Sequence, residues 1–331
     1  MPEFDIITIG DNTIDVFMEL EKSDIRIVDE NKDGIEDLVM DFGSKIPVKK
    51  LTRLAAVGNA ANNAWGSARL GLNTAYYTHL GDDPDSDETK QVLKSIGIHD
   101  DYFVTEPGKK SNFSTVINVE AERTILVYHT TWDYKLPENM ASANWIYYTS
   151  VGHGYEKTGL DEQILEFCER TGTKLAYQPG SHQLRNGLEY NMKLIPKCGF
   201  LVMNREEAAD LLGKPRDQEC QDSVRQFLEM GAEIVAVTDG PAGSHAGDSS
   251  GVWFQDIYDI EVVERTGCGD SYATGFLAAI AKGNDVKTAM KWGTVNAAGK
   301  LRMIGGRDGQ LTEQEVNDWL AKKPEFGPVE A

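Results

Sequence analysis

Strand-like and helix-like segments alternate along the second half of the chain, and this pattern limits the possible folds most. Four short runs rich in apolar, β-branched or aromatic residues read WIYYTS, KLAYQ, FLVM and EIVAVT. Runs with apolar residues at helical spacing lie among them, at residues 160–170, 206–212 and 223–230. Strands that alternate with helices are joined by right-handed crossovers into a mostly parallel sheet covered on both faces. The sequence therefore predicts an α/β fold.

The N-terminal part continues this alternation but contains two interruptions. FDIITIG and TAYYTHLG are typical of strands, and residues 62–70 between them are typical of a helix that ends at Gly71. Residues 17–50 are rich in charge, and residues 111–128 contain two β-rich runs around the polar turn EAER, which indicates a hairpin. The two interruptions could pair into a small separate sheet, or each could be a decorated surface loop. We expect a large domain of residues 1–12, 51–110 and 130–331, and a small β lid of residues 13–50 and 111–129.

Composition excludes several classes of protein. A formal charge of −20 over 331 residues argues against a nucleic-acid partner, because phosphates would be repelled. The sequence has no apolar run long enough to span a membrane and no signal peptide at its N-terminus. The four cysteines show no CxxC pairing, which favours reduced thiols and a cytoplasmic location over a zinc site. Any anionic ligand would need local positive groups to overcome the overall negative charge.

One glycine-rich turn, in the stretch ERTGCGDSYATGF, stands at the predicted start of a helix near residues 268–270. Asp270 could simply cap that helix. The two glycines could instead expose successive backbone N–H groups, which is how helix N-termini bind phosphate. The other common glycine and histidine motifs (GxGxxG, GxxxxGK[ST] and HExxH) are absent from the chain.

Five segments together resemble the ribokinase-like (PfkB) family of carbohydrate and nucleoside kinases. They are IGDNTIDVF, VGNAANNAWGSARLG, MNREEA, VTDGPAGS and RTGCGDSYATGF, and they occur in the family's order over nearly the whole chain. The family's usual Gly-Gly pair is Val57-Gly58 here. The resemblance implies a three-layer α/β/α fold with a small β-sheet lid. It also implies an ATP-dependent phosphotransferase that phosphorylates a hydroxyl group, of the hydroxymethyl kind, on a small sugar.

The resemblance also implies a role for each matching residue. The backbone N–H groups of Gly267, Cys268 and Gly269 would form an anion hole for the transferred phosphoryl group. Asp270 would orient the acceptor hydroxyl and accept its proton late in the reaction. The groups that grip the acceptor would be Asp11, Asp15, Gly58, Asn59 and Asn62. For Asp15 the alternative is a loop or capping residue, and for Asn62 it is a helix N-cap.

The nucleotide side would be formed by Asn204, Thr238, Gly240, Gly243 and Asn296. Glu207 would organise Mg²⁺ through water, because Mg²⁺ retains several of its waters. Each has a simpler alternative: Glu207 could complement a helix dipole, the glycines could only form a turn, and Asn296 could be a packing residue.

Two departures from the family pattern concern cations and thiols. The family commonly has Asp-Thr before the last Thr-Gly, where the aspartate helps form a monovalent-cation site, but this chain has Glu264-Arg265. The resemblance therefore leaves activation by K⁺ open. Cys268 replaces an alanine, and its place at a helix N-terminus predicts a lowered thiol pKa and sensitivity to alkylation.

The acceptor is the least defined part of the prediction. Arg123 and Arg185 are the only obvious cations for gripping a phosphorylated sugar, so we expect a free sugar, with a nucleoside or a sugar phosphate as the alternatives. Two other classes of function are a catalytically silent binding protein on the same fold and a nicotinamide-dependent oxidoreductase. Asp270 and Glu207 argue against the first, and the missing GxGxxG fingerprint argues against the second. Unpaired lid edges would be covered in a lid-to-lid homodimer, which is common in this family.

Overall fold

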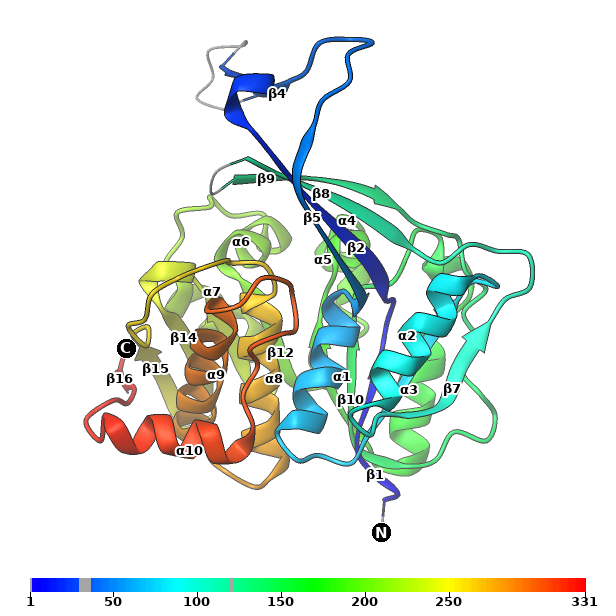
Figure 1. Cartoon of the computed structure of the whole chain (residues 1–331). Helices are drawn as coiled ribbons and strands as arrows, with labels where there is room; N and C mark the ends of the chain where they lie inside the picture. The colour runs from blue at the N-terminus through cyan, green and yellow to red at the C-terminus, as the bar shows by residue number, and fades with distance from the viewer. Residues whose placement is uncertain (1, 30–36, 120–121) are drawn as a thin grey trace.

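A large twisted sheet forms the centre of the molecule (Figure 1). The computed structural model describes residues 2–29, 37–119 and 122–331. Within these residues the sheet has ten strands, in the order β16 (Val329–Glu330), β15 (Gly251–Gln255), β14 (Ser244–Asp248), β13 (Val235–Thr238), β12 (Cys198–Asn204), β11 (Lys174–Gln178), β10 (Ala143–Thr149), β1 (Phe4–Ile9), β6 (Thr74–Leu80) and β7 (His99–Thr105). Pairing is parallel from β13 to β7 and antiparallel from β13 to β16.

Helices cover both faces of this sheet. One face is covered by α3 (Leu160–Thr171), α4 (Ser181–Arg185), α5 (Gly187–Asn191), α6 (Arg205–Leu212) and α7 (Cys220–Glu229). The other face is covered by α1 (Asn59–Arg69), α2 (Pro84–Lys94), α8 (Cys268–Ala281), α9 (Val286–Leu301) and α10 (Glu313–Lys322). Successive strand residues enter opposite cores, as Ile6 and Ile7 do, because side chains alternate along a strand. The three-layer α/β/α prediction is confirmed.

A second, four-stranded sheet lies across one edge of the body as a lid (Figure 1). Its described strands follow the order β5 (Val48–Val57), β2 (Thr13–Leu20), β8 (Phe113–Val119) and β9 (Glu122–Tyr128). The hairpin expected at residues 111–128 is β8 and β9, and β2 pairs with β8, so the two interruptions do form one sheet. One boundary was wrong: β5 belongs to this sheet, so residues 51–57 are part of the lid. Residues 120–121 of the EAER turn lie outside the described residues.

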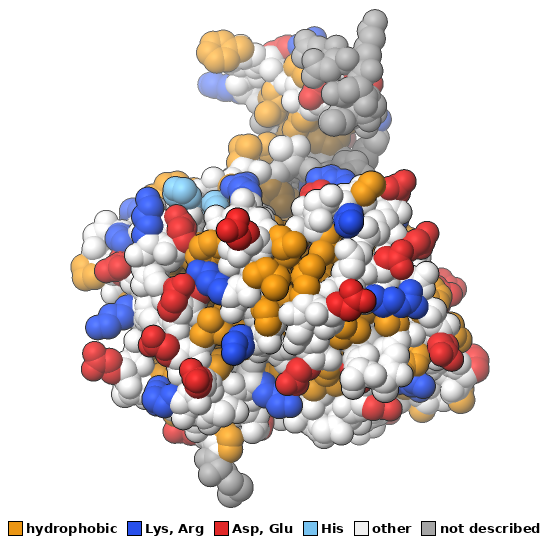
Figure 2. Space-filling model, turned by 180° about the vertical axis from the view of Figure 1, so that it is seen from behind, with side chains coloured by type: hydrophobic (Ala, Val, Ile, Leu, Met, Phe, Trp, Pro, Cys, Tyr) orange, Lys and Arg blue, Asp and Glu red, His pale blue; other side chains and the backbone are white. Residues whose placement is uncertain are grey.

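A short arm projects beyond the lid (Figure 1). It contains β3 (Arg26–Val28) paired with β4 (Asp37–Val39). A small apolar cluster at its base joins it to the lid, with Leu20 and Ile25 packed against Ile117 and Val119. Figure 2 shows hydrophobic side chains on this arm and an intermixed distribution of acidic and basic side chains over the rear face of the body.

Close packing of α8 on α9 fixes the helix that carries the glycine turn. A Cβ atom added to Gly275 would lie 2.7 Å from the Trp292 carbonyl oxygen and 2.9 Å from Asn296 Cβ. Phe276 stacks on Phe200 of β12, with ring centroids 4.6 Å apart, and this contact anchors α8 to the sheet. No helix in the described residues is long and apolar enough to cross a membrane.

We expect Gly275→Ala to lower the free energy of unfolding by about 1–3 kcal/mol, because the added methyl group has no room between α8 and α9. Urea unfolding followed by circular dichroism measures this change. Gly269→Ala in the same helix is the matched control: a Cβ there meets nothing within 4 Å, so stability should be unchanged or higher by up to about 1 kcal/mol. Equal destabilisation by both changes would contradict the packing argument.

Candidate active site

The glycine turn presents unpaired backbone amides at the N-terminus of α8. Gly267 is the N-cap residue and has φ +74°, a left-handed conformation that favours glycine. A side chain at Gly267 would also collide with the backbone of Gly306. The N–H groups of Gly267, Gly269 and Asp270 donate no hydrogen bond to any described residue, whereas that of Cys268 donates to the Arg265 carbonyl at 3.3 Å. The turn can therefore bind an anion, although one of the three expected amides is already used.

Asp270 is held at this turn by side chains from two other elements. It is the third residue of α8 and is only 7% exposed. Its Oδ2 accepts a hydrogen bond from Asn62 Nδ2 of α1 at 2.8 Å, and its Oδ1 accepts one from Gln178 Nε2 at the end of β11 at 3.2 Å. Tyr147 donates its hydroxyl proton to Gln178 Oε1. These contacts fix the carboxylate in one orientation.

Burial raises the pKa of Asp270 above its ordinary value. The hydrogen bonds from Asn62 and Gln178 and the positive charge of Lys300 act in the opposite direction. A buried carboxylate with a raised pKa is a better proton acceptor than an exposed one, because its basicity lies closer to neutral pH.

Asp11 and Asp15, the two acids expected to grip the acceptor, lie in different surroundings. Asp11 follows β1 and is buried, with both carboxylate oxygens 2.9 Å from the hydroxyl group of Tyr134. Burial raises the pKa of Asp11 to about 7. Burial also raises the pKa of Asp15, in β2 of the lid, to about 6, against the effect of the nearby Ser114 hydroxyl. Asp15 Oδ1 is buried and has no hydrogen-bond partner among the described residues.

The start of α1 supplies the other expected acceptor groups. Gly58 is the N-cap of α1, with φ +97°, so Asn62 is not the helix cap and that alternative is wrong. Asn62 Oδ1 is buried and has no partner within the described chain. Asn59 is the first residue of α1 and is half-buried, with no side-chain hydrogen bond to the described residues. The unsatisfied Asn62 Oδ1 lies beside Asp270, because the same amide group bonds to Asp270 directly.

On the expected nucleotide side, Asn204 and Glu207 form a capping box at the start of α6. Asn204 Oδ1 accepts from the Glu207 N–H at 2.8 Å, and Glu207 Oε2 accepts from the Asn204 N–H at 3.0 Å. Burial raises the pKa of Glu207, and the negative charge of Asp270 acts in the same direction. The negative charges of the two carboxylates therefore oppose each other, and a nearby cation would relieve this repulsion.

The remaining nucleotide-side residues fall into two groups. Thr238 ends β13 and lies beside Asn204 in the sheet register. The turn after it contains Gly240 with φ +51° and Gly243 with φ +90°, where a side chain would collide with the Gln255 carbonyl. These residues share the carboxyl edge of the sheet with the end of β12.

Asn296 is completely buried in α9, and its amide is satisfied within the core. Its Nδ2 donates to the Ser271 carbonyl at 2.7 Å and to Gln310 Oε1 at 3.1 Å, and its Oδ1 accepts from the Leu311 N–H at 2.8 Å. This arrangement favours the packing alternative, so Asn296 is left out of the site proposed below.

The thiol of Cys268 was predicted wrongly. Burial raises its pKa and the negative charge of Asp270 adds to this, and together they exceed the opposing influence of the positively charged Lys300 and Arg265. A mostly protonated thiol is a poor nucleophile, so the expected sensitivity to alkylation does not follow.

Several residues that build the site were not assigned from the sequence. Gln178 orients Asp270, Tyr134 caps the carboxylate of Asp11, and Arg307 donates to the carbonyls of Ala55 and Ala56 just before Gly58. Gln178 lies in the stretch YQPGSHQLRNG, which is a polar sequence directly after a predicted strand. Its position at a strand's carboxyl end was the signal that could have identified it.

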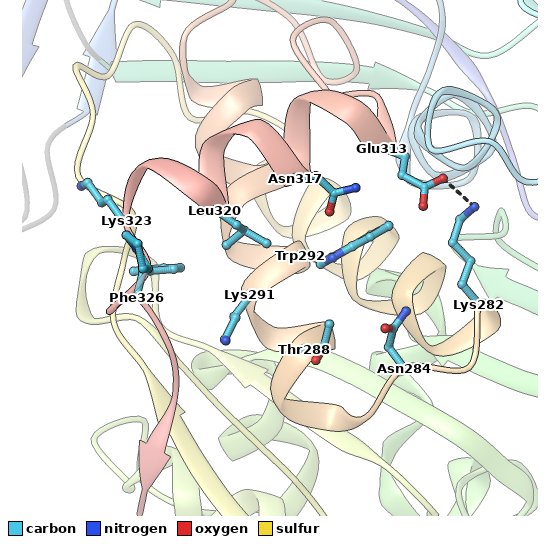
Figure 3. A pocket seen from close by; sticks show the side chains of 11 residues that line it. Lys282, Asn284, Thr288, Lys291, Trp292, Glu313, Asn317, Leu320, Lys323 and Phe326 are labelled. Atoms are coloured by element: carbon cyan, nitrogen blue, oxygen red, sulfur yellow. Dashed lines mark hydrogen bonds and ion pairs between the residues drawn. The ribbon is translucent and has the colours of Figure 1, made fainter.

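A separate cavity of about 480 Å³ lies at the opposite end of α8, between α9 and α10 (Figure 3). Two of its three lysines have partners: Lys282 pairs with Glu313 at 2.9 Å, and Lys323 lies over the ring of Tyr258. None of the predicted site residues lines this cavity, so it is not part of the site around Asp270.

Comparison with known proteins identifies the family. The pfkB family of carbohydrate kinases matches residues 29–312, and the chain belongs to this family. It is a carbohydrate kinase with the ribokinase fold. The 5-dehydro-2-deoxygluconokinase of Bacillus subtilis is 24% identical over 279 residues, which cover 80% of this chain and 86% of that protein.

Two solved structures have the same fold over almost the whole chain. A nucleoside kinase of Methanocaldococcus jannaschii superposes with a TM-score of 0.77 at 20% identity, covering 97% of this chain and 100% of that one. Ribokinase of Arabidopsis thaliana, complexed with ribose and ATP, gives a TM-score of 0.75 at 20% identity, with 95% and 98% covered.

The raised pKa of Asp11 predicts how stability depends on pH. The folded protein binds the Asp11 proton more tightly than the unfolded chain, so this group contributes stability that is complete below about pH 4 and is lost as pH rises to about 7. Asp11→Asn should remove up to about 4 kcal/mol of that decline. Urea unfolding between pH 4 and 8 measures it. The exposed change Asp222→Asn should leave the slope of the parent unaltered, and an equal slope in Asp11→Asn and parent would contradict the assignment.

Proposed function

We propose that this kinase transfers the γ-phosphoryl group of ATP to a hydroxymethyl group of a small sugar. The observation that carries the proposal is the position of Asp270, a buried and oriented carboxylate beside three unpaired N–H groups at a helix N-terminus. The amides can hold a phosphoryl group while the carboxylate holds the alcohol that attacks it. The ribose and ATP in the Arabidopsis ribokinase structure agree with these two ligand classes.

The N–H groups would stabilise the charge that spreads over the phosphoryl oxygens in a loose transition state. A helix N-terminus alone contributes only about 0.3–2 kcal/mol, so the aligned amides of Gly267, Gly269 and Asp270 supply most of the attraction. Such local donors are essential in a chain with a formal charge of −20.

Asp270 would act on the acceptor hydroxyl. The hydroxyl oxygen forms a bond to the γ-phosphorus as the bond to the bridging oxygen breaks, the hydroxyl proton passes to Asp270, and ADP leaves. In a loose transition state this proton moves late, so orientation by Asn62 and Gln178 contributes as much as basicity.

The acceptor would lie between the lid and the start of α1. Asp15 Oδ1 and Asn62 Oδ1 are buried acceptors without partners in the described chain, and sugar hydroxyls are donors that could satisfy both. Asn59 and the backbone of Gly58 lie at the same helix start, and Asp11 lies close to Gly58. Closing these polar groups over a sugar would also exclude water from the reacting hydroxyl.

ATP would extend from the glycine turn toward Asn204, Thr238 and the Gly240–Gly243 turn, along the carboxyl edge of the sheet. Glu207 fits a magnesium-organising role, because its half-buried carboxylate is repelled by the negative charge of Asp270, and a cation would relieve that repulsion. When bound, Mg²⁺ would neutralise phosphate charge and retain part of its water shell.

A free sugar is the acceptor we favour, because few cations are placed to hold a second phosphate. Nucleosides and sugar phosphates are the alternative acceptors within the same family. The relatives are named for different acceptors: one is a 5-dehydro-2-deoxygluconokinase and another a nucleoside kinase.

A lid-to-lid homodimer would cover the apolar edge of the lid. The side chains of β9, Ile125, Leu126, Val127 and Tyr128, are all more than 40% exposed on this edge strand. An exposed apolar edge strand is a site of association or aggregation unless it is covered.

Replacing Asp270 by Asn should lower turnover by about 10²–10⁴-fold, because the amide cannot accept the proton. Nucleotide affinity should stay near that of the parent. A coupled ADP-release assay with ribose, fructose, adenosine and cytidine gives the turnover and the preferred acceptor together. Asp161→Asn, which removes a buried carboxylate on α3 far from the site, is the matched control and should turn over normally. Normal turnover in Asp270→Asn would refute the assigned role.

Leu126→Lys should convert a lid dimer into a monomer, because a buried ammonium would have no partner at the interface. Sedimentation velocity at micromolar concentration measures the mass of the parent and the variant. Ile257→Lys, at an exposed apolar residue of the body, is the control and should leave the dimer intact. A monomeric parent would exclude the dimer.

A further inference from the structure

A buried ammonium group lies directly behind the glycine turn. Lys300, near the C-terminal end of α9, has 0% of its surface exposed. Its Nζ donates to the Glu264 carbonyl at 3.0 Å, to Glu264 Oε2 at 3.2 Å and to the Met303 carbonyl at 3.2 Å. An ammonium group has three donors, so all three can be satisfied at once. The group is therefore a cation enclosed by oxygen atoms.

A buried ammonium group destabilises the folded protein unless an opposite charge is paired with it. Glu264 provides the compensating charge. Although burial opposes it, the pKa of Glu264 is lowered by hydrogen bonds from Thr266 and Gly305 and by the charge of Lys300. Burial lowers the pKa of Lys300, against the attraction of Glu264. A solvent-facing pair could move freely, but this one is confined within the protein.

The Glu264 carboxylate links the ammonium to both loops that form the turn. Its Oε1 accepts from the Thr266 N–H at 2.7 Å, and Thr266 directly precedes Gly267. Its Oε2 accepts from the Gly305 N–H at 3.1 Å as well as from Lys300. Two segments distant in sequence are thus held together by one ion pair.

The second loop continues this chain of contacts to the catalytic carboxylate. Gly306 follows Gly305 and packs so closely against Gly267 that a Cβ on Gly267 would collide with the Gly306 carbonyl oxygen. A Cβ on Gly306 would lie 2.7 Å from Asn62 Nδ2, the atom that donates to Asp270. Displacement of Lys300 would therefore be transmitted both to the unpaired amides and to the group that orients Asp270.

We propose that Lys300 is a positioning residue whose ammonium serves as the chain's own fixed monovalent cation behind the anion-binding turn. The turn then keeps its shape without K⁺ or any other free cation. The inference rests on the proposed function, since the turn's ligand is the phosphoryl group. It explains Glu264: a longer carboxylate than the aspartate usual in the family reaches an ammonium rather than a bare ion. The positive charge also acts at Asp270, where it favours the ionised form.

The parent protein provides the first test. Its kcat/KM, and its affinity for Mg²⁺ with a non-hydrolysable ATP analogue by calorimetry, are measured in potassium chloride and in tetramethylammonium chloride at equal ionic strength. Both quantities should agree within about twofold between the salts, because the cation is already in place. A tenfold or greater activation by K⁺ would overturn the inference and leave the kinase function standing. Absence of nucleotide binding in either salt would overturn both.

Substitution of the lysine provides the second test. Lys300→Met removes the charge and keeps the approximate shape, and it should reduce kcat/KM by about 10²-fold through displacement of the turn. Lys300→Ala leaves a space, and K⁺ or ethylammonium should restore part of its activity, which tetramethylammonium is too large to do. A purely structural lysine would show no such rescue. Lys287→Met, at an exposed lysine of the same helix, is the control and should behave as the parent.

Two results of the Lys300 substitutions would contradict the inference. Folded Lys300 variants with parental kinetics in every salt would contradict the inference. A folded Lys300→Ala variant that loses activity and is not rescued by any small cation would also contradict it, because charge would then not be the essential property. If neither variant folds, the salt comparison on the parent decides the question alone.

Discussion

The site depends on one buried carboxylate that three separate elements hold at the positive end of a helix. Asp270 belongs to α8, its partners Asn62 and Gln178 belong to α1 and β11, and none of these is near another in sequence. Bringing them together requires α1 and α8 to pack closely on the same face of the sheet. Gly66 of α1 permits this, because a Cβ there would collide with Gln310 and lie 2.7 Å from the Thr274 side chain of α8. The close packing of α1 on α8 is therefore also what places Asn62 beside the Asp270 carboxylate.

A chain with a formal charge of −20 would have to create its attraction for a triphosphate locally. The structure has groups with fixed positions that could supply it: backbone amides at a helix N-terminus and an ammonium buried behind them. Fixed dipoles and charges in a buried site require little reorganisation when charge develops on the phosphoryl group. Mobile surface lysines would be weaker, because solvent and salt screen them.

Much of the fold could be predicted from the sequence, because strand and helix periodicities are local. The parallel sheet, the hairpin at residues 111–128 and the start of α8 near Cys268 were all expected and are all present. The lid boundary was misplaced, because β5 (Val48–Val57) is a charged strand whose outer half has no apolar alternation. It is a strand only because β2 pairs with it.

The site was predictable where a motif marks it and not where it depends on packing. Asp270 and the glycine turn follow from the sequence, whereas Gln178 and Lys300 act through contacts over 92 and 36 residues of sequence separation. The predicted lowering of the pKa of the Cys268 thiol was wrong for the same reason. Its position at a helix N-terminus is visible in the sequence, but its burial, which is the largest cause of its raised pKa, is not.

The most direct test is a crystal structure with Mg²⁺ and a non-hydrolysable ATP analogue. The account predicts the terminal phosphate within hydrogen-bonding distance of the N–H groups of Gly267, Gly269 and Asp270, with the Asp270 carboxylate facing the open side of the phosphorus atom. A terminal phosphate bound elsewhere, for example in the cavity between α9 and α10, would contradict it.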